Sequence, residues 1–123
     1  MKRPVSDLLG KQLSKVELVH DKNSGTDEII FTCEDGTEYR MYHEQVCCES
    51  VTIEDICGDL DDLVGLPIIA AAESSSYVGK RDDFKSSTWT FYNLATAKGH
   101  VTLRWYGESN GYYSESADFR EVT

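Results

Sequence analysis

Apolar and polar residues alternate along much of this chain, which is the pattern of β-strands with one buried face. The alternation is clearest near the C-terminus, where Val101, Leu103 and Trp105 are separated by polar residues and followed by Tyr106. Trp89 and Phe91 begin a similar run. Further strands are expected over residues 12–20, 27–43 and 66–72. The pattern therefore predicts a mostly antiparallel sheet of about six strands.

The first hairpin of this sheet is expected around Glu34-Asp35-Gly36. A three-residue loop with Gly36 in the left-handed region pairs Phe31 with Tyr39 and keeps one face of the hairpin apolar. The same loop pairs Ile29 with Met41. A two-residue Asp-Gly turn would instead place Phe31 opposite Arg40, so we prefer the longer loop.

A second hairpin is expected near the C-terminus, around Ser109-Asn110-Gly111. Here a three-residue loop pairs Val101 with Phe119 and Leu103 with Ala117. A tight Asn-Gly turn would set Leu103 against Asp118, which would bury a charge or expose the leucine.

One amphipathic helix is expected over residues 53–64. Thr52 is a suitable N-cap residue, and Gly65 can end the helix in the left-handed conformation. At about 100° per residue, one arc of the helix collects only apolar side chains and cysteine. These residues are Ile53, Ile56, Cys57, Leu60, Leu63 and Val64. We therefore expect an α+β fold in one domain, residues 1–123, with this helix packed on one face of the sheet and residues 1–12 forming a loose N-terminal arm.

Charge is distributed unevenly along the chain. Its formal net charge is −10, and no lysine or arginine occurs between Arg40 and Lys80, a stretch that holds eight of the twenty-two acidic residues. Strong negative charge disfavours binding to nucleic acid or to anionic lipid. No apolar run approaches the ~18 residues of a membrane span. A basic protein surface, a cation and mere solubility are the explanations that remain open.

Two surfaces are predicted to bind a partner. The first is the polar side of the expected helix, an acidic face formed by Glu54, Asp55, Asp59, Asp61 and Asp62. The second is the polar face and tip of the C-terminal hairpin, because arginine, tyrosine and asparagine suit an adaptable recognition surface. Its residues are Arg104, Tyr106, Asn110 and Tyr112. An ordinary solvated surface explains either set equally simply.

A thiol or metal site is the alternative reading of the acidic stretch. His43, Cys47 and Cys48 are its candidate residues. A closed zinc site favours two cysteines separated by two or more residues, and adjacent cysteines rarely reach one ion. A Cys–His pair for nucleophilic catalysis can be drawn from these residues, but the sequence does not fix its geometry. We therefore expect no metal and no cofactor.

Two long segments resemble a family of small uncharacterised proteins encoded by bacteriophages and by bacterial genomes, often as prophage genes. They are CCESVTIEDICGDLDDLVGLPI (residues 47–68) and TWTFYNLATAKGHVTLRWYGESNGYYSESADF (residues 88–119). The resemblance implies a phage or prophage context and an intracellular protein. It carries no established activity, although small acidic phage proteins frequently bind and block host factors.

These observations predict a phage-encoded acidic binding protein in the host cytoplasm. Its partner is expected to be a host protein with a basic surface, such as a nucleic-acid-binding component of a defence system, which it contacts and inhibits. Direct binding to nucleic acid or membrane is not expected, and the oligomeric state is left open. The alternative function is a small-ligand-binding protein or a thiol- or metal-dependent enzyme centred on His43, Cys47 and Cys48.

Overall fold

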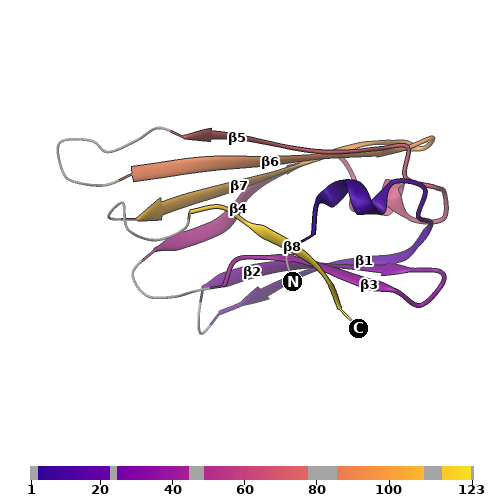
Figure 1. Ribbon diagram of the computed structural model, residues 1–123, viewed down its shortest axis with the longest axis horizontal. Helices are drawn as coiled ribbons and strands as arrows, with labels where there is room; N and C mark the ends of the chain where they lie inside the picture. Colours follow the sequence, from indigo (N-terminus) through magenta and orange to yellow (C-terminus); the bar gives the residue numbers. More distant parts are fainter. Residues whose placement is uncertain (1–2, 23–24, 45–48, 78–85, 110–114, 123) are drawn as a thin grey trace.

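Two antiparallel four-stranded sheets lie face to face in the computed structural model, as Figure 1 shows. The structure describes residues 3–22, 25–44, 49–77, 86–109 and 115–122. Within these ranges there are eight strands, and the only helical segments are two short 3-10 helices. The expected α+β fold is therefore wrong, although the expected antiparallel pairing is confirmed. No helix among the described residues is long and apolar enough to cross a membrane.

The first sheet has the strand order β1-β2-β3-β8. Its strands are β1 (Leu13–Asp21), β2 (Thr26–Cys33), β3 (Glu38–Tyr42) and β8 (Asp118–Val122). The predicted hairpin register is confirmed, because Phe31 pairs with Tyr39 and Ile29 pairs with Met41. Gly36 has a φ of 92°, the left-handed conformation that the three-residue loop requires.

The second sheet has the strand order β4-β7-β6-β5. Its strands are β4 (Ser50–Cys57), β5 (Ala70–Tyr77), β6 (Ser86–Thr96) and β7 (Gly99–Ser109). The predicted C-terminal hairpin is wrong. Leu103 pairs with Tyr92 of β6, not with Ala117, and β8 crosses to the first sheet to pair with β3. Pairing Leu103 with Tyr92 and pairing it with Ala117 both keep apolar side chains on the buried face. Alternation of apolar and polar residues therefore could not identify the partner strand of β7.

The expected helix over residues 53–64 is also wrong, and a β-bulge explains the error. Val51 and Ile53 point into the molecule on β4, and the ladder with β7 then shifts register between Ile53 and Asp55. The extra residue places Ile56, rather than Asp55, opposite the buried Leu103. A bulge in a strand thus produces the spacing of three residues that is also typical of a helix face.

Gly58 ends β4 in a conformation that a helix would not allow. Its φ is 108°, and a Cβ atom at this position would lie 2.5 Å from the carbonyl oxygen of His100. After this turn Asp59 caps the 3-10 helix η2 (Leu60–Leu63), accepting a hydrogen bond from the Asp61 amide at 3.0 Å. The segment is therefore a strand, a tight turn and a short helical turn.

The core fills the space between the sheets. Trp105 is its largest fully buried side chain, and its indole N–H contacts the sulfur of Met41 on the opposite sheet at 3.3 Å. Phe119 stacks on Tyr39 with a centroid distance of 5.2 Å and meets Phe31 edge to face at 6.0 Å. Such aromatic pairs add specific geometry to the burial of apolar area.

The two open sides of the sandwich are covered differently. The 3-10 helix η1 (Val5–Leu8) lies beside β5, and both Val5 and Leu8 are buried in the core. Just before it, the Arg3 amide donates to the Phe119 carbonyl of β8. On the other side β2 approaches β4, where Asp27 Oδ2 of β2 accepts a hydrogen bond from the Ile53 amide at 2.8 Å.

Replacing Gly58 by alanine tests the strand-and-turn assignment. In a helix the change would stabilise the protein by about 1 kcal/mol. In this turn it should destabilise the protein by about 1–3 kcal/mol from backbone strain alone, and by more because of the contact with His100. Urea unfolding measures the difference. Gly36→Ala is the matched control, since Gly36 also has positive φ but open space around it. A gain in stability for Gly58→Ala would contradict the fold.

Candidate interaction surfaces

Aromatic side chains gather on the outer face of the second sheet. Inward residues of β6 and β7 fill the core, so Trp89, Phe91 and Tyr106 point outward and stay half-buried. Trp89 pairs across the strands with Tyr106, with ring centroids 4.7 Å apart, and lies nearly parallel to Phe91 at 6.2 Å. Figure 1 shows no described element over this face. We call the surface formed by Trp89, Phe91, Tyr106 and Arg104 the aromatic face.

Arg104 joins the aromatic face to β4. Its guanidinium carbon lies 5.1 Å from the Trp89 ring centroid and 5.9 Å from that of Phe91, which are cation–π distances. Its Nη1 lies 3.4 Å from Asp55 Oδ2, and both side chains remain substantially exposed. Arg104 and Tyr106, predicted as binding residues, are therefore brought together with two aromatic residues that the prediction did not include. Asn110 and Tyr112 lie outside the described residues.

The five predicted acidic residues do not form one helix face. Glu54 and Asp55 are exposed on β4, beside the aromatic face, whereas Asp59, Asp61 and Asp62 belong to the turn of η2. This separation follows from the extended conformation of β4, because a strand advances about 3.3 Å per residue. The acidic stretch therefore presents two separate groups of carboxylates.

The acidic residues at η2 form hydrogen bonds that hold the turn. Asp59 caps η2, and the Asp62 carbonyl accepts a hydrogen bond from the Thr96 hydroxyl. Lys98 Nζ donates to the Val64 carbonyl at 2.8 Å, so a base from the β6–β7 turn lies near this group. Cys57, expected to be buried, is exposed because it points outward on β4 opposite Thr102.

His43 is buried between the two sheets. Its Nδ1 lies 3.0 Å from the Ser116 carbonyl, to which it can donate, and its Nε2 lies 3.4 Å from Glu49 Oε2. Both ring nitrogens thus face oxygen atoms of the protein. Cys47 and Cys48 lie outside the described residues. Among the described residues, no three His, Cys, Asp or Glu side chains are close enough together to hold a metal ion.

Sequence reasoning missed a buried carboxylate at the end of the second sheet. The Glu115 side chain accepts hydrogen bonds from the hydroxyls of Ser86 and Ser109, and from Thr88 Oγ1 at 2.9 Å. These donors satisfy a carboxylate that would otherwise be costly to bury. The cluster anchors the chain as it leaves the second sheet toward β8.

Gly107 is the residue from which this close approach of the chain could have been predicted. It occupies an inward position of β7, where the alternation calls for a large side chain. A Cβ atom at Gly107 would lie 2.0 Å from the Glu115 carbonyl oxygen, so the two backbones can approach only because the residue is glycine. An isolated glycine within a strand often marks such an approach.

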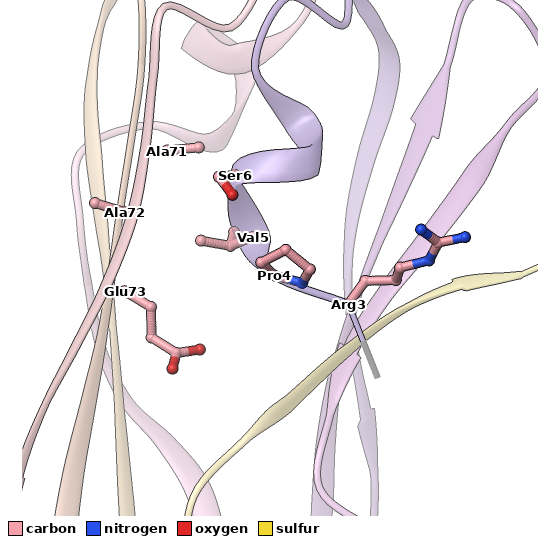
Figure 2. A pocket seen from close by; sticks show the side chains of 7 residues that line it. All are labelled: Arg3, Pro4, Val5, Ser6, Ala71, Ala72 and Glu73. Carbon is pink, nitrogen blue, oxygen red and sulfur yellow. The ribbon is translucent and has the colours of Figure 1, made fainter. Parts of the chain in front are cut away.

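Two hollows lie at the open sides of the sandwich. A cavity of about 440 Å³ separates η1 from β5 and is lined by Arg3, Pro4, Val5, Ser6, Ala71, Ala72 and Glu73. Figure 2 shows Val5 pointing across it toward β5, with Arg3 and Glu73 as the charged residues of its wall. Glu73 also lies close to the Tyr92 hydroxyl. Burial raises the pKa of Tyr92, and the negative charge of Glu73 adds to this effect.

The second hollow is a groove of about 320 Å³ between β1 and β4. Leu18, Ile53 and Ile56 give it an apolar floor, and Asp27, Glu54 and Asp55 give it an acidic rim. Leu18 points inward from β1 yet is 48% exposed, because this side of the sandwich is open. The groove therefore combines apolar and acidic surface next to the aromatic face.

Replacing Glu115 by alanine tests the anchor. The change leaves three hydroxyl groups without their common acceptor, so we expect the free energy of unfolding to fall by about 1–3 kcal/mol. Glu108→Ala on the outer face of β7 is the control and should change stability by less than about 0.5 kcal/mol. Denaturant unfolding monitored by fluorescence checks both variants. Equal stability of Glu115→Ala and the parent would show that the carboxylate contributes nothing.

The comparisons with known proteins identify a family and no activity. Neither the curated proteins nor the solved structures contain a match to this chain. A family model matches residues 6–119, a range that includes β1 to β7, η2, the first two residues of β8 and all of η1 except Val5. By this match the chain belongs to the family described as Domain of unknown function (DUF7448).

Proposed function

We propose that this chain is an acidic binding protein whose second sheet contacts a protein with a basic surface. The observation that carries the proposal is the uncovered aromatic face. Tryptophan, tyrosine and arginine are the residues that most often dominate the energy of protein–protein contacts. Here Trp89 contacts both Tyr106 and Arg104 on an open sheet.

The charge around the aromatic face supports a basic partner. β4 and β5, the two edge strands of this sheet, belong to the stretch without lysine or arginine, and the whole chain carries a formal charge of −10. Complementary charge accelerates association and favours basic over acidic partners. Negative charge of this size disfavours nucleic acid as the direct ligand.

The groove beside β4 supports contact with lysine or arginine side chains. The long aliphatic part of such a side chain can pack on Leu18, Ile53 and Ile56. Its charged end can then reach the carboxylates of Glu54 and Asp55 at the rim. One partner could thus occupy the groove and the aromatic face together, because Asp55 borders both.

A host protein is the partner that the resemblance to phage and prophage proteins supports. Nucleic-acid-binding components of bacterial defence systems have the basic surfaces that this account requires, and a small acidic protein could occupy such a surface and inhibit it. The contact would then take place in the cytoplasm of the host cell.

Removing the largest ring of the aromatic face tests the proposal. Trp89→Ala should weaken binding to a basic host protein captured from lysate by about 2 kcal/mol or more, roughly 30-fold in Kd. Calorimetry or surface plasmon resonance with the purified partner measures the loss. Tyr77→Ala is the matched control, because Tyr77 is an exposed aromatic residue of β5 outside the aromatic face. Equal affinity of Trp89→Ala and the parent would refute the proposed face.

Two charge-matched variants test the acidic contribution. Glu54→Gln/Asp55→Asn and Asp61→Asn/Asp62→Asn each remove two negative charges, one pair beside the aromatic face and one pair at η2. We expect the first variant to lose about tenfold more affinity, and its residual binding to depend less on salt than that of the parent. Binding measured between low and high salt concentration gives both quantities. Equal losses would mean that only total charge matters.

A further inference from the structure

The free edge of β5 differs from the other three sheet edges. Exposed edges invite pairing with another strand, and proteins usually block them with bulges, charges, short strands or covering segments. β1 contains a register shift near Lys15, and β4 contains the bulge at Ile53–Asp55. β8 has only five residues, and the Phe119 carbonyl is bonded by the Arg3 amide.

β5 is less protected within its described length, where Glu73 is its only charged residue. It pairs with β6 through eight consecutive residues without a register shift. Its sequence, AAAESSSY, contains no proline or lysine, and all of its residues except Ala71 are exposed. Small side chains leave the backbone open to a strand that adds to the sheet by main-chain hydrogen bonds.

If two copies of β5 pair symmetrically, the register determines which residues of the two strands lie opposite one another. When two identical antiparallel strands pair about a two-fold axis, the residue at the axis lies opposite its own copy. With Ser74 at the axis, Ala72 lies opposite Ser76 and Glu73 lies opposite Ser75, so the two copies of Glu73 do not face each other. Tyr77 of one copy then lies opposite Ala71 of the other.

Ala71 lines the cavity beneath η1, and Tyr77 is 66% exposed. Both residues point toward the inner side of the sheet, since Ala71 pairs with the buried Leu94 and Tyr77 is six positions further along the strand. Directly opposite residues have Cβ atoms about 5 Å apart. The ring of Tyr77 from a second copy would therefore reach the cavity, whose wall of Pro4, Val5 and Ala71 is shown in Figure 2.

We propose that two copies of this chain pair through their β5 edges about an axis at Ser74, and that Tyr77 of each copy fills the cavity between η1 and β5 of the other. The ring packs on the apolar wall, on the side of η1 that faces β5. The pair joins the two second sheets into one sheet of eight strands and leaves both aromatic faces uncovered. This association is independent of the proposed function.

Charge gives the pairing a distinctive salt dependence. Each copy carries a formal charge of −10, so the two copies repel one another at low ionic strength. Screening reduces this repulsion. The dimer should therefore become tighter as salt is added, whereas binding to a basic protein becomes weaker.

Sedimentation equilibrium of the parent and of Tyr77→Ala tests the cavity contact. The parent should dimerise, and Tyr77→Ala should raise the dimer Kd by about 100-fold because both rings are lost. Trp89→Ala, the variant that should disrupt partner binding, should leave the dimer unchanged. A parent that stays monomeric up to about 1 mM at moderate salt would overturn the proposal.

A charge exchange at the axis tests the register. Ser74→Asp and Ser74→Lys each place like charges directly opposite one another, and each should raise the dimer Kd by about tenfold or more. Mixing the two variants should restore a dimer, because aspartate then lies opposite lysine. Recovery also shows that both variants are folded. Loss of dimerisation without recovery in the mixture, or a dimer that neither variant affects, would show that Ser74 is not at the axis.

Discussion

Packing of Trp105 against the opposite sheet holds the two layers of this protein together. The indole ring is fully buried in the second sheet, and its N–H contacts the sulfur of Met41 in the first. The same alternation that turns Trp105 inward turns Arg104 and Tyr106 outward. The aromatic face is therefore a direct consequence of how the core is filled. Its outward side chains are excluded from the core and stay half-buried on the outer surface of the sheet.

Alternation in the sequence correctly indicated strands and the register of the first hairpin, because Gly36 and the apolar pairs around it are local signals. It could not assign Leu103 to its partner strand. Tyr92 and Ala117 are both inward residues, so either pairing keeps the apolar faces together, and the choice depends on the packing of whole sheets. Long-range pairing of this kind leaves no mark in a short stretch of sequence.

The stretch that carries −8 of the formal net charge of −10 was misread for a physical reason. The bulge at Ile53–Asp55 gives β4 the spacing of a helix face, and a capping residue and a glycine lie where helix ends are expected. The β-branched residues Val51, Thr52 and Ile53 favoured a strand, and Gly58 within the expected helix was a second warning. Of the predicted binding residues, Arg104, Tyr106 and Asp55 come together, whereas the acids of η2 lie apart.

The surfaces at the edges of the second sheet have different roles in this account. On the β4 side an acidic groove borders the aromatic face, which suits a basic partner. On the β5 side a regular edge strand and a cavity beside η1 suit a second copy of the chain. Because the aromatic face lies between them and points away from the core, one assembly could use both edges at once.

The two tryptophans provide the most direct test of the central claim, which is that the sandwich turns Trp105 inward and Trp89 outward. Hydrogen exchange of the two indole N–H groups, followed by nuclear magnetic resonance, measures this difference. The account predicts that the Trp105 proton exchanges only through global unfolding, whereas the Trp89 proton exchanges rapidly in the free protein. Rapid exchange at Trp105, or equal protection of both indoles, would contradict it.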